Sequence, residues 1–348
     1  MKKGENMPVT INDVAKEAGV SITTVSRALN NNYPVKEDTR IRIEKAIEKL
    51  NYKPNIAARS LITRKTSVIG IVVPGITNLF FPTLVEIIEG FLTRSGYSIS
   101  LCNTGGEALK EVELINQMMS RQVDGLIVID PSLENLDNGY FDEISKSLPM
   151  IVVNGFPGTH KCNFVSYDEE IGSREAFMYL LELGHRKIAF VRGNKSLSYD
   201  IKEKVYKNIV KSNGLNYEKV LHVGKGNSID VVERTQEQIE ELLSGGERPT
   251  AFFACNDLMA VGVVNACNRL GISIPVEISV IGFDNTLISG ITHPKLTSVD
   301  LNISEIGRRA ALELIDIIDN RNKSRIKFFL ETSLIVRDSC GKVESAST

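Results

Sequence analysis

The stretch VTINDVAKEAGVSITTVSRALN, residues 9–30, carries the pattern that decides the fold of the N-terminal region. Thr10 followed by Asp13 predicts the start of a helix, because these two side chains can bond to free N–H groups of the first turn. Gly19 is expected to make a tight turn, since a close reversal of the chain often needs a positive φ. Ser21 can then cap a second helix. Two short helices joined by a turn are therefore predicted.

A third helix is expected in TRIRIEKAIEKL, residues 39–50. Apolar residues recur there at helical spacing, as they do in the first two helices. We expect these faces to form one small core from Val14, Ala15, Ala18, Val25, Ala28, Leu29, Ile43, Ala46, Ile47 and Leu50. Three such helices are typical of a helix-turn-helix module that binds DNA, although a small helical domain that binds protein is an alternative.

Charge is unevenly distributed along the 348 residues. Residues 1–65 hold 13 Lys and Arg against 7 Asp and Glu, whereas the rest of the chain holds 28 against 36. A basic head on an acidic body suggests that the head meets a polyanion, although a basic tail without function is an alternative. Short hydroxyls and an Arg suit the phosphates and base edges of a major groove. The second helix keeps such residues off its apolar face, namely Ile22, Thr23, Thr24, Ser26 and Arg27.

The segment PNIAARSL, residues 54–61, predicts a helix too short to be stable by itself. Pro54 suits a first helical turn, because its φ is fixed and its missing N–H is not needed there. Ala57 and Ala58 offer little surface to bury, and Leu61 stands at the far end. The segment alone does not explain why the chain has a helix of such low stability at this position.

From Thr66 onward the sequence changes to short apolar strands that alternate with helices. Helices are expected over 84–93, 107–120 and 171–183, and strands in SVIGIVVP, YSISLCN, GLIVID, MIVVNG, KIAFVRG, TAFFACND and ISVIGFDN. The alternation predicts a parallel α/β fold, and the number of strands favours two Rossmann-like lobes around a cleft. Ligands of such sheets bind beyond the carboxyl ends of the strands.

Several classes of protein are disfavoured. The five cysteines show no C-x-x-C spacing, which fits reduced thiols and a cytoplasmic protein. The first residues lack the apolar segment of a signal peptide, and Pro and Gly interrupt the uncharged run 66–85, so neither export nor a membrane span is expected. Common nucleotide-binding, hydrolase and metalloprotease motifs are absent, and the four histidines are scattered. We therefore expect no enzyme, no cofactor and no metal site.

TINDVAKEAGVSITTVSRALN together with LNYKPNIAARSL resembles the N-terminal DNA-binding domain of the LacI/GalR family of bacterial transcriptional regulators. The resemblance implies that the second helix reads an operator, with Ile22, Thr23 and Arg27 at the bases. Contacts to the DNA backbone are implied for Thr10, Ser21, Thr24, Ser26 and Asn30. One departure is Lys36, where the family usually has a Ser or Thr that caps the third helix.

The same resemblance explains residues 54–61 as a hinge helix that folds in pairs on the operator. Leu61 is then the wedge that enters the minor groove and kinks the duplex, while Ala57 and Ala58 let two hinge helices pack closely. Asn55, Ala58 and Leu61 are the implied hinge contacts. A Leu61 that merely fills the linker or docks on the body is the alternative.

VDGLIV, LGHRKIAFV, CNDLMAVG and ISVIGFDN resemble the effector-binding domain of this family, which is related to periplasmic sugar-binding proteins. The resemblance implies a helix-turn-helix domain at 1–53, a hinge and linker at 54–65, an effector-binding and dimerisation domain at 66–340, and a tail at 341–348. It also implies two lobes linked by three crossovers, at about 66–166 with 297–326 and at about 167–296 with 327–340.

Polar and aromatic residues near the strand ends are the candidates for binding an effector, namely Asn78, Phe80, Phe81, Asp168, Arg192, Lys202, Phe253, Asn256 and Asp284. For each of them the alternative is a core or capping role, and for Phe81 and Phe253 a core role is equally expected. Lys202 stands where sugar-binding members have an Arg. Because Lys is a point charge, it suits a carboxylate or phosphate better than a sugar diol, and Arg192 is placed to join it. The expected effector is a sugar, a sugar acid or a sugar phosphate.

We therefore expect a dimeric regulator, as a rule a repressor in this family, that binds a pseudo-palindromic operator under the control of a small effector. A regulator that responds to a phosphoprotein co-repressor is an alternative, but His293 stands where that branch has an Arg before Pro294. A sugar-binding protein and a sugar-modifying enzyme are more distant alternatives. The face formed by Leu84, Ile87, Ile88 and Phe91 is expected to serve either the dimer or the core.

Overall fold

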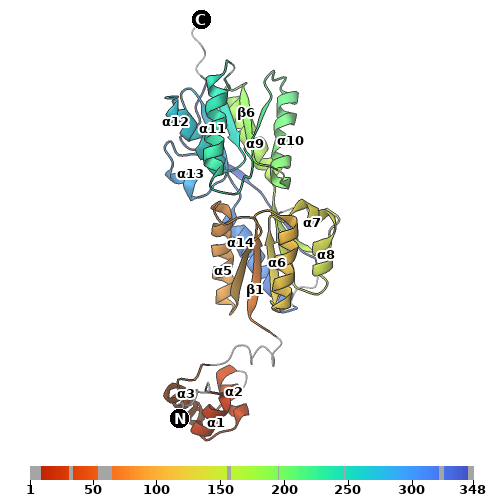
Figure 1. Cartoon of the computed structure of the whole chain (residues 1–348), viewed down its shortest axis with the longest axis vertical. Coiled ribbons are helices and arrows are strands. Elements are labelled where there is room, and N and C mark those ends of the chain that lie inside the picture. Colours follow the sequence, from red (N-terminus) through yellow and green to blue (C-terminus); the bar gives the residue numbers. More distant parts are fainter. Residues whose placement is uncertain are drawn as a thin grey trace, which may run out of the picture. The chain divides into compact units, whose positions relative to one another are not determined.

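The structure is a computed structural model that describes residues 9–30, 34–53, 65–154, 158–194, 196–246, 248–320 and 325–343. The chain divides into two compact units, residues 1–66 and 67–348, which we call the head and the body (Figure 1). The predicted hinge contacts Asn55, Ala58 and Leu61 lie outside the described residues. The head and the body are described separately below.

Within residues 9–30 and 34–53, the head forms the helices α1 (Ile11–Ala18), α2 (Ile22–Asn30) and α3 (Glu37–Leu50). Val14, Val25 and Ile43 are buried at its centre, which confirms that the predicted apolar faces form one core. Gly19 turns the chain between α1 and α2 with a φ of 66°, a conformation that glycine adopts at little cost. Helix α3 begins after Lys36, whose side chain makes no capping hydrogen bond.

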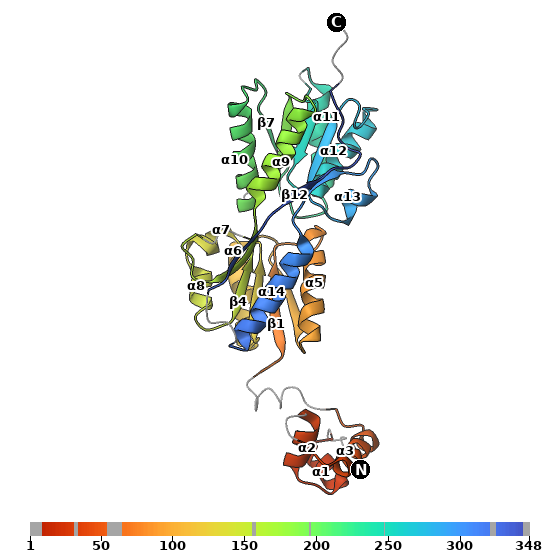
Figure 2. The ribbon, with the colours of Figure 1, turned by 180° about the vertical axis from the view of Figure 1, so that it is seen from behind.

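The first lobe of the body contains a parallel sheet with the strand order β11-β5-β4-β3-β1-β2. The strands are β1 (Val68–Val73), β2 (Ser98–Asn103), β3 (Gly125–Ile129), β4 (Met150–Val153), β5 (Asn163–Tyr167) and β11 (Lys327–Leu330). Helices α5 (Phe80–Arg94) and α14 (Ile303–Ile318) pack together on one face (Figure 2). The other face is covered by α6 (Ala108–Ser120), α7 (Leu133–Asp137) and α8 (Tyr140–Ile144).

The second lobe contains a similar sheet with the order β12-β10-β9-β8-β6-β7, in which only β12 runs antiparallel to its neighbour. The strands are β6 (Ile188–Arg192), β7 (Lys219–His222), β8 (Ala251–Ala254), β9 (Ser279–Asp284), β10 (Thr297–Asp300) and β12 (Ser333–Ile335). Its helices are α9 (Glu169–Glu182), α10 (Leu197–Ser212), α11 (Val231–Ser244), α12 (Asp257–Arg269) and α13 (Leu287–Ile291). The two parallel sheets with helices on their faces are the predicted α/β architecture.

The chain passes between the two lobes three times, from β5 to α9, from β10 to α14 and from β11 to β12. Two of the predicted lobe boundaries are wrong. Strand β10, at 297–300, pairs with β9 of the second lobe, and β11, at 327–330, pairs with β5 of the first lobe. The chain therefore passes between the lobes a few residues later than predicted. The reason is that hydrogen bonding to a neighbouring strand, rather than local sequence, decides which lobe a strand joins.

The apolar face of α5 belongs to the core. Leu84 and Ile88 are fully buried, and a Cβ built on Gly307 of α14 would lie only 2.6 Å from Ile87 Cγ2. Helix α5 thus packs closely on α14, which favours the core role over the dimer role for this face.

Candidate functional sites

The outer face of α2 carries the side chains predicted to contact DNA. Ile22 is 48% exposed, and Thr23 and Arg27 are also exposed, whereas Val25 on the opposite side of the helix is fully buried. One face therefore holds the helix in the core, and the other lies at the surface of the head, as in a helix that enters a groove. Asn30 is the last residue of α2, and its side chain lies outside the described part of the chain.

Two capping residues fix the starts of the first two helices. Asp13 accepts hydrogen bonds from the N–H and the hydroxyl of Thr10, each at 2.8 Å, and the backbone bond is the main reason why the pKa of Asp13 is lowered. Ser21 Oγ accepts from the N–H of Thr24 at 3.2 Å. Thr10, Ser21 and Thr24 thus stand at helix starts, where backbone N–H groups favour contact with a phosphate.

A cavity lies between the two lobes, beyond the carboxyl ends of several strands. It is lined by Asn78, Phe80, Phe81, Asp130, Asn154, Tyr167, Ser196, Ser198, Tyr199, Lys202, Asn227, Cys255, Asn256 and Asp284. Its volume is about 20 Å³, which is room for about one water molecule, because the side chains of the protein fill most of it. A compartment of about 410 Å³ adjoins it along Asp130, Ser196 and Asn227.

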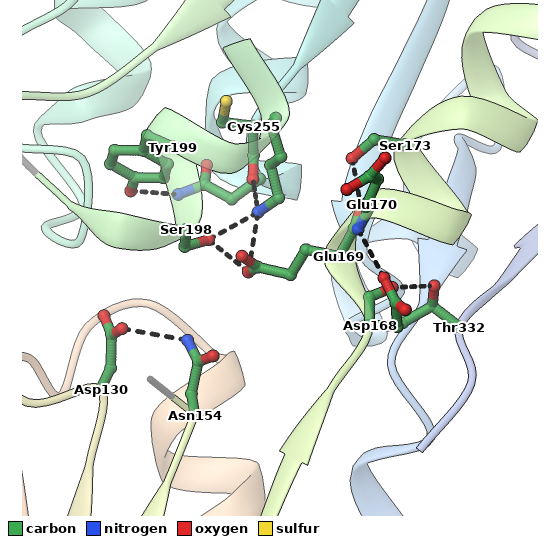
Figure 3. A network of polar contacts seen from close by, with 12 residues as sticks. Asp130, Asn154, Asp168, Glu169, Glu170, Ser173, Ser198, Tyr199, Cys255 and Thr332 are labelled. Atoms are coloured by element: carbon green, nitrogen blue, oxygen red, sulfur yellow. Dashed lines mark hydrogen bonds and ion pairs between the residues drawn. The ribbon is translucent and has the colours of Figure 1, made fainter. Parts of the chain in front are cut away.

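A buried ion pair borders this cavity (Figure 3). Lys202 Nζ lies 2.8 Å from Ser198 Oγ, 3.3 Å from the Cys255 carbonyl and 3.5 Å from Glu169 Oε1. The ammonium also lies 3.6 Å from the centre of the Phe283 ring, a favourable cation–π contact. Two hydrogen bonds and the ion pair engage Lys202 within the protein, so its charge is already compensated and is not available for a carboxylate or a phosphate of a ligand.

Two further carboxyl groups face the cavity, one from each lobe. Asp130, after β3, accepts a hydrogen bond from Asn154 Nδ2 at 3.1 Å, and burial together with the charge of Glu169 raises its pKa to about 7. Asp284, at the end of β9, is buried, and burial raises its pKa well above the usual range. The φ of Asp284 is 101°, which favours glycine, so the backbone is strained at this position.

Six of the predicted effector residues line the cavity, namely Asn78, Phe80, Phe81, Lys202, Asn256 and Asp284. Asn256 also caps α12, because its Oδ1 accepts from the N–H of Met259 at 2.9 Å. Its amide group donates to the carbonyl of Gly226 at 3.0 Å. Asn256 therefore helps to shape the cavity wall.

Three predicted residues do not line the cavity. Asp168 caps α9 by accepting from the N–H groups of Glu170 and Ile171, and it lies apart from the ion pair in Figure 3. Phe253 is a fully buried core residue, and the centre of its ring lies 4.5 Å from the centre of a neighbouring aromatic ring, on which it stacks. Arg192 pairs with Asp200 at 2.6 Å and with Glu203, and it lines a compartment of about 690 Å³ that adjoins the cavity along Ser196, Tyr199 and Asn227.

The sequence prediction missed several residues that line the cavity, notably Asp130, Asn154, Tyr199 and Asn227, and also Glu169, which pairs with the cavity residue Lys202. Asp130 and Asn154 directly follow the buried strands β3 and β4, which is the signal that had selected Asp284. Glu169 had no such signal, because it lies inside the first turn of a helix.

Within the described part of the chain, no group of three or more His, Cys, Asp and Glu side chains is placed to hold a metal ion. Among the same residues, no helix is long and apolar enough to cross a membrane.

Comparisons with known proteins give consistent results for both units. Residues 10–55 match the family described as bacterial regulatory proteins, lacI family, and residues 177–340 match the periplasmic binding protein-like domain. The chain is 36% identical over 304 residues to catabolite control protein A of Priestia megaterium, covering 86% of this chain and 90% of that protein. It is 33% identical over 338 residues to the HTH-type transcriptional repressor PurR of Vibrio vulnificus, covering 96% and 99%.

Solved structures show the same fold. The Lac repressor dimer bound to operator and the anti-inducer ONPF matches with a TM-score of 0.83 at 25% identity, over 96% of this chain and 99% of that one. A LacI family transcriptional regulator from Enterococcus faecium with bound ribose matches with a TM-score of 0.69 at 28% identity, over 80% and 100%. The family resemblance and the predicted fold class are confirmed.

Proposed function

The chain belongs to the LacI family of bacterial regulatory proteins and is thus a DNA-binding transcriptional repressor with an effector-binding body. We propose that two heads bind a pseudo-palindromic operator as a homodimer. We also propose that the cavity between the lobes binds a small effector, which controls the binding of the operator. The observation that carries the proposal is the two-faced α2, with Val25 buried and Ile22 48% exposed.

In the head, Ile22, Thr23 and Arg27 contact base edges, and Thr10, Ser21, Thr24, Ser26 and Asn30 contact the DNA backbone. The exposure of the first three and the positions of Thr10 and Ser21 at helix starts support these assignments. In the hinge, Asn55, Ala58 and Leu61 complete the interface, with Leu61 as the minor-groove wedge.

A second copy of the chain is the proposed partner of the body. Strand β2 forms an edge of the first sheet, and its Leu101 is 44% exposed. An open edge with an apolar side chain favours association with another chain. The Lac repressor structure named above is a dimer, which supports the same arrangement by family.

The proposed effector is a small polyol of the sugar class. Phe80 and Phe81 offer apolar surface, and carboxyl and amide groups such as Asp284 and Asn78 suit hydroxyl groups. The ribose complex named above supports this class by relationship. Among the effectors expected from sequence, a neutral sugar suits the cavity better than a sugar acid or phosphate, because Lys202 is already paired with Glu169.

Effector binding is proposed to shift the balance between two arrangements of the lobes, and thereby the spacing of the hinges. A coupling of about 1–3 kcal/mol would change operator affinity about 5–150-fold. No enzymatic reaction is proposed, and we place the protein in the cytoplasm, where its operator DNA lies.

The test compares two variants of the full chain that each lose one positive charge. Arg27→Ala lies on the exposed face of α2, and Lys110→Ala lies on the exposed surface of the body. With an operator fragment selected from random DNA, Arg27→Ala should abolish sequence-specific retardation, whereas Lys110→Ala should bind like the wild type. If Arg27→Ala binds the operator with the affinity and specificity of the wild-type protein, then α2 does not read the operator.

A further inference from the structure

We propose that the effector of the cavity between the lobes is an amino polyol, a small organic cation whose protonated amino group is held by the carboxyl groups of Asp130 and Asp284. This inference rests on the proposed function, because it narrows the chemical class of the effector for the same cavity. It differs from the expectation of an acidic sugar that Lys202 suggested.

The first argument is the charge around the cavity. Two carboxyl groups line it, Asp130 from the first lobe and Asp284 from the second, and Glu169 lies outside the lining, paired with Lys202. Among the described residues that line it, Lys202 is the one basic side chain. One adjoining compartment, of about 410 Å³, has Glu111, Asp130 and Glu134 in its wall, and its described lining includes no Lys, Arg or His, whereas another of about 690 Å³ has Arg192, His222 and Lys225 in its wall.

The second argument is that acceptors, and not charged donors, remain available. The ammonium of Lys202 donates to Ser198 Oγ and to the Cys255 carbonyl and is paired with Glu169. In contrast, the carboxyl group of Asp284 lines the cavity, is only 7% exposed and receives no hydrogen bond from the described residues. A buried acceptor without a partner is costly, so a ligand that donates to Asp284 is favoured.

The third argument concerns protons. Burial raises the pKa of Asp130 to about 7 and that of Asp284 well above its usual range. The charged groups that face Asp130 are Glu169, Lys202 and Glu111, and those that face Asp284 are Lys202, Asp257, Glu169 and Asp130. The cavity thus holds protons near neutral pH when no ligand is bound. An incoming ammonium group stabilises the carboxylates, and the displaced protons pass to water.

The sign of the pH dependence follows from this exchange. An amine with a pKa well above 8 stays charged, so its binding strengthens as pH rises from about 6.5 to about 8, because fewer protons must be displaced. An acid that binds to the same cavity requires these protons to stay, so its binding weakens over the same range. A neutral polyol displaces few protons and changes little.

The experiment uses three molecules with the same six-carbon polyol chain, namely glucamine (a cation), sorbitol (neutral) and gluconate (an anion). Thermal unfolding of the full wild-type chain is measured with each of the three molecules at a pH of about 6.5 and of about 8, since a ligand of the folded state raises the unfolding temperature. We expect glucamine to stabilise the chain most, with an apparent affinity about tenfold higher than that of sorbitol, and more strongly at the higher pH. Stabilisation by gluconate equal to or above that by glucamine overturns the proposal.

Two sets of variants test whether the stabilisation by the amine arises in the cavity. Asp284→Asn should remove the stabilisation by glucamine, whereas Asp137→Asn, an exposed carboxyl on α7, should keep it. Lys202→Ala leaves a hole with the shape of propylammonium beside Glu169. Propylamine should therefore raise the unfolding temperature of Lys202→Ala, and propionate should not.

Operator retardation is measured on the wild-type protein without any ligand. If glucamine does not stabilise the wild-type chain, the cavity is not a cation site, whatever propylamine does to Lys202→Ala and even where operator binding is intact. If Lys202→Ala does not fold, the three polyols on the wild-type chain decide alone, and absence of stabilisation by glucamine counts against the proposal. Loss of operator binding in the wild-type protein would instead overturn the proposed function.

Discussion

The side-chain amide of Asn78 in the first lobe donates a hydrogen bond to Asn227 Oδ1 in the second lobe, over 3.3 Å. Next to it, the N–H of Ile229 donates to Thr77 Oγ1 at 3.2 Å. A Cβ on Gly75 would stand only 2.7 Å from the carbonyl oxygen of Asn227, so the backbones also approach closely here. These contacts hold the lobes together at one edge of the cavity and are placed to respond to its contents.

Replacing Asn227 should therefore change the balance between lobe arrangements. Asn227→Ala removes the bond to Asn78 and the bond from Tyr199 OH, which is 3.1 Å long. A neutral hydrogen bond contributes about 1 kcal/mol, so operator affinity in the absence of effector should change about fivefold. Fluorescence anisotropy with labelled operator measures it. Asn268→Ala, an exposed amide in the same lobe, serves as control, and identical affinities for both variants would mean that this contact does not control the lobes.

The Lys202–Glu169 pair should show strong coupling. Lys202→Met leaves Glu169 buried without its cation and should cost about 3–5 kcal/mol of unfolding free energy. The double variant with Glu169→Gln should recover most of this loss, because no charge is then left uncompensated. Urea unfolding of the four proteins gives the coupling energy, and additive effects of the two substitutions would contradict the prediction.

Gly172 in α9 packs without space for a side chain. A Cβ there would lie 2.5 Å from Thr332 Oγ1 and from Val299 Cγ1. We expect Gly172→Ala to destabilise the body by about 1–3 kcal/mol, because the neighbours must shift. Gly290→Ala, where no atom lies within 4 Å, should be neutral or slightly stabilising in a helix. Thermal unfolding compares the two, and equal effects would refute the packing argument.

Two residues of α2 should separate stability from DNA binding. Ile22→Ala should reduce operator affinity about tenfold and leave the stability of the head unchanged, because Ile22 is 48% exposed. Val25→Ala should destabilise the head by about 2 kcal/mol, because Val25 is fully buried. Operator anisotropy and circular dichroism measure the two effects. The interpretation of α2 fails if Ile22→Ala melts the head or leaves operator affinity intact.

Asp257 should make stability depend on pH. Its carboxyl accepts from Ser298 Oγ at 2.6 Å and from the N–H of Thr286 at 2.7 Å, yet burial raises its pKa from 3.8 to about 6. The folded state therefore binds more protons than the unfolded state in this range, so stability falls as pH rises from about 4 to about 6. Urea midpoints across this window should fall less steeply for Asp257→Asn. If the urea midpoint of Asp257→Asn falls with pH as steeply as that of the wild type, Asp257 does not cause the pH dependence of stability.

The head was predictable because its signals are local. Helical spacing of Val14, Val25 and Ile43 selects the buried faces, and Gly19 marks the turn between α1 and α2. The same reasoning identified seven strands of the body, whose apolar runs are long enough to stand out. Strands β5, β7, β10, β11 and β12 were not identified, and the lobes of β10, β11 and β12 are decided by the strands with which they pair rather than by local sequence.

The candidate site was less predictable, because neighbouring residues have opposite roles. Asp168 was selected as a ligand, but an Asp before a helix is a favourable cap, and this signal was present in the sequence. Glu169 then turns toward Lys202, which lies 33 positions further along the chain. Whether a lysine is free or neutralised depends on such a contact, and no spacing rule reveals it.

The three crossovers also govern the order in which the protein is made. A ribosome releases the first sheet without β11 and the second without β12, and both strands emerge only with residues 327–335. Neither lobe is complete before that point, whereas the three helices of the head end at residue 50. Because domains fold as they emerge, the nascent chain carries a folded DNA reader long before it has a sensor. A ribosome that stops within the body would leave a reader that no effector controls.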